Sequence, residues 1–114
     1  MYEEVAAKWW GNQFRYLSKS ANIVVRHLFD DPINMFESIL ARDLKKEVEH
    51  CGYSRIVCEN TPDEIICNAA RYAGLSTTII PKQTRMFVSK NCVEVSTDST
   101  DPTSQYEIIY RRSY

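Results

Sequence analysis

The spacing of apolar residues changes near Gly52, and this change limits the folds that the chain can adopt. Before Gly52 the apolar positions follow steps of three and four, the spacing of one helix face. Most of the remaining chain consists of short runs of β-forming residues separated by turn signals. We therefore predict an α+β fold with N-terminal helices packed on a C-terminal antiparallel sheet. A length of 114 residues, 44% of them hydrophobic, suits a single domain over residues 1–114.

The first helical region is predicted from Glu3 to Leu28. Gly11 weakens it, and a break costs least at Ser18-Lys19-Ser20, so we expect this helix in two pieces.

A second helix start is predicted at Asp31, whose carboxylate can accept a backbone N–H as the N-cap. Pro32 would take the first helical position, where it loses no hydrogen bond, and Gly52 would end the helix. A strand is expected to follow over residues 53–59.

The segment Thr61-Pro62-Asp63-Glu64 predicts a capping box, in which Thr61 caps the N–H of Glu64 and the Glu64 carboxylate reaches back. The short helix that it opens should end at Gly74. Residues 77–80 predict either a short strand or a connector.

The C-terminal third predicts a three-stranded antiparallel meander. The strands are expected over Arg85–Ser89, Cys92–Thr97 and Tyr106–Arg112. Lys90-Asn91 has the length of a tight hairpin link, with Asn91 best able to take a positive φ. The polar stretch 98–105 would connect the last two strands. This meander and strand 53–59 would together form the sheet.

The chain offers little of the chemistry that an enzyme or a cofactor site needs. Its three glycines are too far apart for a phosphate-binding loop, and no Cys or His spacing matches a zinc site. His50-Cys51 is better explained as a helix C-terminus with Cys51 packed inward, and Cys67 as a buried thiol. A nuclease pattern built on Asp30 and Asp31 has no second group of metal ligands. We therefore expect a non-enzymatic protein without a cofactor or metal.

The cysteines are expected to be reduced thiols in a cytoplasmic protein. Glu3 and Glu4 interrupt the basic-then-apolar order of a signal peptide. Nothing approaches the roughly 20 apolar residues that span a bilayer, so no membrane association is expected. Without export, disulfides are not favoured. The thiols are Cys51, Cys58, Cys67 and Cys92.

Acidic residues gather in the middle of the chain. Residues 29–64 contain nine acidic and four basic residues, whereas the segments on either side are net positive. Such charge is usually a solvated helix face, but it could form an acidic surface for a basic partner. The candidate partner-binding residues of this segment are Asp30, Asp31, Glu37, Asp43 and Glu47.

Two adjacent tryptophans provide a second candidate contact. Trp9 and Trp10 are about 100° apart around a helix, so one ring should be buried and the other partly exposed. An exposed tryptophan is a typical binding anchor, and Trp9 is taken as that candidate.

Direct nucleic-acid binding is the alternative function. Rings and cations of the C-terminal third could stack on bases and contact phosphates. The near-neutral net charge of −1 and the need of the sheet for a core-facing side count against it. The candidate residues are Arg85 and Arg112, with Lys82, Lys90, Arg111, Phe87, Tyr106 and Tyr110 in the same third.

The order of several segments resembles a group of known proteins. The opening Met1-Tyr2-Glu3-Glu4-Val5-Ala6-Ala7-Lys8-Trp9-Trp10 is similar to the start of small accessory proteins of conjugative elements and phages of gut Gram-positive bacteria. The same holds for Pro62-Asp63 opening a short helix, Gly74-Leu75, Pro81-Lys82-Gln83-Thr84-Arg85-Met86 and a Val-rich hairpin. The stretch from Ser18 to Leu28 and the C-terminal loop differ from that group.

The resemblance implies a setting and no site residues. Small non-enzymatic proteins of mobile elements often block host defences, and inhibitors of CRISPR nucleases are a prominent class. The chain would then be a stoichiometric inhibitor of a host defence nuclease. Its partner would be a protein or ribonucleoprotein, such as a CRISPR effector, that it binds without cutting.

Overall fold

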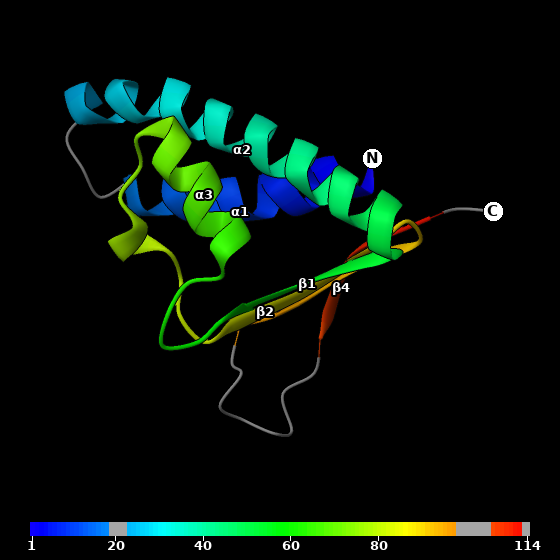
Figure 1. Cartoon of the computed structure of the whole chain (residues 1–114). Coiled ribbons are helices and arrows are strands. Elements are labelled where there is room, and N and C mark those ends of the chain that lie inside the picture. The colour runs from blue at the N-terminus through cyan, green and yellow to red at the C-terminus, as the bar shows by residue number, and fades with distance from the viewer. Residues whose placement is uncertain (19–22, 98–105, 113–114) are drawn as a thin grey trace.

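A computed structural model of the chain confirms the α+β fold and describes residues 1–18, 23–97 and 106–112, without the side chains of residues 17, 18, 23–31 and 79. The α-helices lie on one side of the sheet, as Figure 1 shows. The elements in chain order are α1 (Tyr2–Ser18), α2 (Ile23–Cys51), β1 (Tyr53–Cys58), α3 (Glu64–Ala73), the 3₁₀ helix η1 (Thr77–Ile79), β2 (Thr84–Ser89), β3 (Cys92–Ser96) and β4 (Glu107–Arg111).

The sheet is a four-stranded antiparallel meander in the order β1-β2-β3-β4. Each predicted strand is present, and each of its ends lies within one residue of the predicted position. The register pairs Ile56 with Met86 and Met86 with Val95, which places these side chains on one face. A bulge on β4 shifts the β3–β4 register between Val93 and Glu94. The stretch 98–105 lies outside the described residues.

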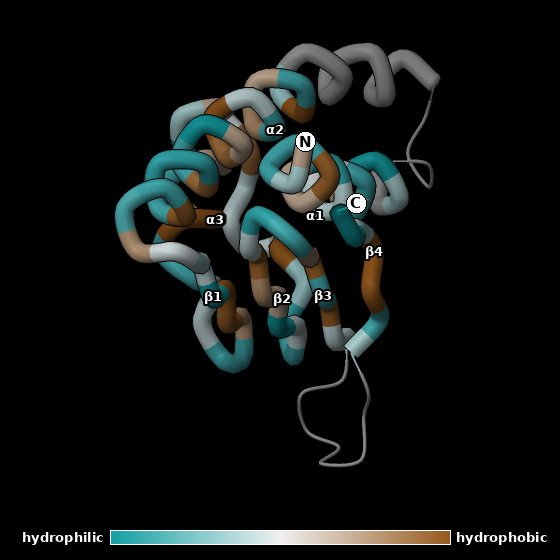
Figure 2. The backbone as a smooth tube through the Cα atoms, turned by 90° about the vertical axis from the view of Figure 1, so that its right-hand side faces the viewer, coloured by the Kyte–Doolittle hydropathy of each residue, from teal (hydrophilic) through white to brown (hydrophobic). Residues whose placement is uncertain are grey.

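The core lies between the helices and the inner face of this sheet. Figure 2 looks along the layers, with the helices above the four strands. Trp10 of α1 and Phe36 of α2 are fully buried, as is Ile56 of β1. The inner-face residues of β1 alternate strictly with exposed or half-buried ones. One apolar layer therefore holds both helices against the sheet.

Gly11 does not interrupt α1, because it lies where α1 and α2 approach closely. A Cβ atom at this position would come within 2.3 Å of Oε2 of Glu37. The absence of a side chain thus lets Glu37 lie against the first helix. α1 ends at Ser18, and the rest of the break expected at 18–20 lies outside the described residues.

The prediction that a helix begins at Asp31 is wrong. α2 begins at Ile23 and continues through Pro32 to Cys51. An interior proline costs about 3 kcal/mol through one lost hydrogen bond and a clash. The helical spacing of Val24, Val25 and Leu28 extends the pattern upstream of the proline, and the local cap signal does not interrupt it. The end at Gly52 is confirmed, with φ 89° and its N–H donating to the Val48 carbonyl at 2.8 Å.

The predicted capping box is also wrong in its cap residue. Asp63 is the N-cap of α3, and its Oδ1 accepts the N–H of Ile65 at 3.2 Å. Its Oδ2 accepts the N–H of Val57 in β1 at 3.0 Å. Asp63 therefore joins strand and helix, which the exposed Thr61 does not do. Gly74 ends the helix with φ 78°, as predicted.

Two local details near the sheet also differ from prediction. Lys90-Asn91 does link β2 and β3, but among the described residues the non-glycine residue with positive φ is Gln83 (57°) and not Asn91. The Ser89 hydroxyl closes the hairpin, with its Oγ accepting the Cys92 N–H at 3.2 Å. Cys51, expected to pack inward, is exposed at the end of α2.

Candidate interaction surfaces

Glu37 is engaged inside the molecule rather than presented to a partner. Its carboxylate makes a bidentate ion pair with Arg15 of α1, at 2.5 Å (Oε1 to Nη2) and 2.9 Å (Oε2 to Nη1). The Glu37 side chain is only 14% exposed. A bidentate Arg–carboxylate pair of this kind fixes geometry and cancels charge, so Glu37 adds little to an acidic surface.

Asp43 and Glu47 do come together with other acids. With Asp63 and Glu64 they line an open hollow of about 360 Å³ between α2 and α3. Arg42 pairs with Asp43 at 3.2 Å, and Lys46 also lines the hollow. The predicted acidic surface is thus present in this part, with some of its charge compensated by neighbouring cations. The side chains of Asp30 and Asp31 lie outside the described ones.

Trp9 and Trp10 divide between surface and core as predicted. The Trp10 ring is fully buried, and its Nε1 lies 3.3 Å from Sδ of Met86. Trp9 is half-buried and meets Trp10 edge to face, with ring centroids 5.0 Å apart. Trp9 and Ile109 line an open, mainly apolar groove of about 430 Å³ between α1 and β4. Trp9 is therefore accessible at an edge of the molecule.

The basic residues of the C-terminal third do not form one cluster. Arg85 on β2 forms an ion pair with Glu59, which is the main cause that raises the pKa of the guanidinium. Arg112 lies exposed beyond β4, where its N–H donates to the Asn91 carbonyl at 2.8 Å. Lys82 lies at a separate hollow of about 440 Å³, which it lines with Arg71. Tyr110, considered for base stacking, packs against the core.

The outer face of the sheet carries an apolar surface that was not predicted from the sequence. No described helix covers this side (Figure 1). Large side chains remain accessible on it, with exposed fractions of 51% for Tyr53, 37% for Phe87 and 43% for Ile108. Tyr106, 40% exposed, interacts with Arg85 beside them. We define the outer sheet face as Tyr53, Arg55, Val57, Arg85, Phe87, Glu94, Tyr106 and Ile108.

Two aromatic side chains of the outer sheet face stack on each other. Tyr53 and Phe87 stack with ring centroids 5.6 Å apart and ring planes at 20°. They sit diagonally across β1 and β2, because the register pairs Tyr53 with Ser89 and Phe87 with Arg55. In the sequence, the alternation of core and surface residues along each strand indicates that these rings point outward. Only the strand register shows that the two rings meet.

The described residues contain no group of three or more His, Cys, Asp or Glu side chains placed to hold a metal ion. None of the helices in the described part of the chain has the length and apolar character needed to cross a membrane. Cys67, as predicted, is buried, with 8% of its surface exposed. Burial also raises the pKa of the Cys58 thiol to about 11. A thiol with such a pKa is a poor nucleophile at neutral pH.

We expect all four cysteines to titrate as thiols in unfolded, non-reduced protein, because each is a free cysteine in the fold. In the folded protein the exposed Cys51 should react first with a thiol reagent and the buried Cys58 last. Time-resolved mass spectrometry of the modified protein measures both. Two or fewer thiols in the unfolded protein would contradict the expectation.

The sequence matches no protein-family model, and no curated protein is significantly similar to it. Among solved structures, the fold is similar to that of the BTG/Tob domain of C. elegans FOG-3, solved as a double variant. The two share 16% sequence identity and superpose with a TM-score of 0.62 over 98% of this chain and 83% of that chain. At this identity the similarity concerns the fold alone.

Proposed function

We propose that the chain is a non-enzymatic domain that binds another protein through its outer sheet face. The observation that carries the proposal is the group of accessible rings and aliphatic side chains on a face that no described helix covers. Exposed apolar groups that gather on one face are typical of interaction surfaces. Tyr, Phe and Arg are also the side chains enriched in such interfaces.

The identity of the partner is a narrower proposal, which rests on the resemblance of the opening residues and of several later segments to accessory proteins of mobile elements. Under it, the partner is a defence nuclease of a Gram-positive gut bacterium, bound stoichiometrically. The acids around the hollow between α2 and α3 would then accelerate association with a basic nuclease surface. That contribution should weaken as salt is raised.

Capture from a host lysate tests the proposal. Tyr53→Ser combined with Phe87→Ser should remove at least about nine-tenths of the captured partner, because central aromatic anchors dominate interfaces. Tyr16→Ser combined with Tyr72→Ser is the matched control, since these rings are 75% and 78% exposed but lie on helices. Equal loss in both variants, or in neither, would contradict a role for the outer sheet face.

Single-stranded nucleic acid is the second candidate, favoured by one observation. Arg55 and Arg85 lie on the same face as Tyr53 and Phe87, which permits stacking beside cations. Nuclease treatment of the lysate and fluorescence anisotropy with labelled oligonucleotides separate the two candidates. Micromolar or tighter binding that Arg55→Glu abolishes would replace the protein-binding proposal.

A further inference from the structure

We propose that the outer sheet face binds the same face of a second copy of this chain, forming a two-fold symmetric dimer. This inference rests on the proposed function and names a partner for the same surface. It follows from the order of charges across the sheet.

One row of side chains crosses all four strands. The register pairs Arg55 with Phe87, Phe87 with Glu94, and Glu94 with Ile108. Phe87 therefore has a cation on one side and an anion on the other. Adjacent strands lie about 4.8 Å apart, which puts the Cα atoms of Arg55 and Glu94 about 10 Å from each other.

Neither charge of the row forms an ion pair with a described residue. Arg55 is exposed and makes no hydrogen bond or ion pair with the described residues. Glu94 has a weak contact with Sγ of Cys92 at 3.6 Å, and no ion pair joins it to a described residue. Both are therefore available to a partner.

A two-fold axis along β2, passing over Phe87, makes this row complementary to itself. The axis places β1 of one copy over β3 of the other. Arg55 then faces the partner's Glu94, Glu94 faces the partner's Arg55, and the two Phe87 rings meet at the centre. Such a contact is isologous and closes at two copies. Sheets that pack face to face with aligned strands lie about 10 Å apart, within reach of these side chains.

The remaining positions on β1 and β2 are compatible with this arrangement, while β4 with Ile108 would lie beyond the partner's β1 at the rim of the contact. Tyr53 would lie over Cys92, a half-buried position on β3 that carries no charge. Arg85 lies on β2, so it would face Arg85 of the second copy. The charge of each Arg85 is already neutralised by its ion pair with Glu59. Tyr53 and Phe87 already stack on each other within one copy, and such preorganisation lowers the entropy cost of binding.

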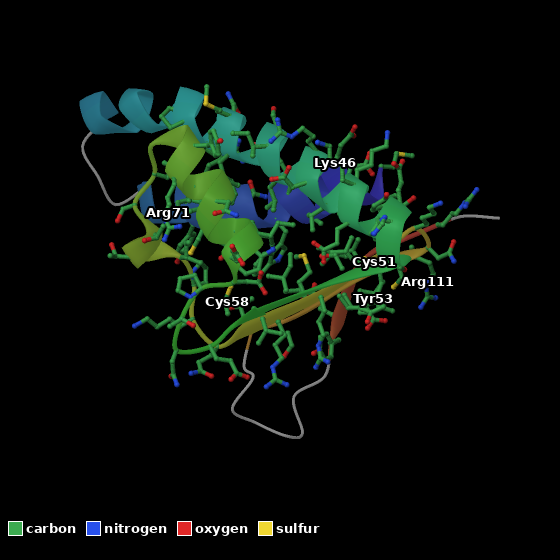
Figure 3. The ribbon with its side chains drawn as sticks, in the orientation of Figure 1. Lys46, Cys51, Tyr53, Cys58, Arg71 and Arg111 are labelled. Atoms are coloured by element: carbon green, nitrogen blue, oxygen red, sulfur yellow. The ribbon has the colours of Figure 1, made fainter. Side chains whose placement is uncertain are left out.

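Charge exchange tests the dimer directly. Sedimentation equilibrium of the full chain should show a reversible dimer that dissociates as salt is raised. Arg55→Glu and Glu94→Arg should each raise the dimer dissociation constant by about tenfold or more, because like charges then face each other. An equimolar mixture of these two variants should form heterodimers, and the variant with both changes should recover the dimer. Lys46→Glu, a charge reversal on the exposed helix side, is the matched control and should not change association (Figure 3).

The proposal is overturned if the wild type is monomeric at all concentrations, or if the doubly changed variant and the mixture associate no better than the single variants. Circular dichroism of each variant establishes that it is folded. If the charge variants leave the wild-type behaviour unchanged while the Tyr53 and Phe87 double variant loses a captured protein, the dimer falls and the proposed function stands. If the Tyr53 and Phe87 double variant changes neither dimer association nor partner capture, the dimer and the proposed function are both wrong.

Discussion

Trp10→Ala should lower the free energy of unfolding by about 3–5 kcal/mol, the typical cost of removing a large buried aromatic side chain. Trp10 is fully buried, stands edge to face with Trp9, and directs Nε1 toward Met86 on the sheet. The substitution leaves a cavity where α1 meets β2. Urea unfolding followed by circular dichroism measures the change. The total free energy of unfolding of a small domain is only about 5–15 kcal/mol, so Trp10→Ala could prevent folding. Trp10→Phe is a milder variant, because it retains an aromatic ring.

Trp9→Ala is the matched control for this prediction. The same residue type is removed one position away, but Trp9 is half-buried at the groove beside Ile109. We expect a loss of about 1 kcal/mol, the typical cost of a single substitution, because the half-buried ring of Trp9 packs only partly against the core. An equal or larger loss than for Trp10→Ala would contradict the orientation of α1.

The fold class and most element ends could be predicted because their signals are local. Gly52 and Gly74 both take the left-handed conformation that ends a helix, and each was identified from its place after an apolar helical pattern. The strands could be predicted because core residues alternate with surface ones in β1 and β2. Patterns of this kind survive folding since they reflect which face is buried.

The starts of α2 and α3 could not be predicted correctly from local signals. The start of α2 depends on the helical pattern upstream, and that of α3 depends on a contact with β1. Asp31 with Pro32 is a good isolated start, yet the helical pattern upstream continues α2 through it. Thr61 and Asp63 are both acceptable caps. Asp63 is used because its second oxygen also accepts a hydrogen bond from β1.

The candidate surfaces could be predicted only in part, for a related reason. Counting charges along the chain identified Asp43 and Glu47, which do share a hollow. The same count included Glu37, whose charge Arg15 cancels from another helix. The outer sheet face unites Tyr53, Phe87 and Ile108 from three strands, and only the register shows that they share one face.

Asp63→Ala should lower the free energy of unfolding by about 2–5 kcal/mol. The loss of an N-cap costs about 0.5–2 kcal/mol, and a hydrogen bond to a charged group contributes about 1.5–3 kcal/mol. Asp63 makes one contact of each kind, to Ile65 of α3 and to Val57 of β1. Its removal therefore loosens the junction between the strand and the helix as well as the helix start. Urea unfolding measures the change, and amide hydrogen exchange should show faster exchange at Val57 and Ile65.

Asp63→Asn separates the two contacts, because asparagine caps a helix as well as aspartate but has only one acceptor oxygen. Asp63→Asn should lower the free energy of unfolding by about half as much as Asp63→Ala. Protection from amide hydrogen exchange should be kept at Ile65 and lost at Val57. Thr61→Ala is the control for the rejected capping box and should change stability by less than about 0.5 kcal/mol, because Thr61 is exposed. A wild-type stability for Asp63→Asn would mean that capping alone matters. A large loss for Thr61→Ala would restore Thr61 as the cap.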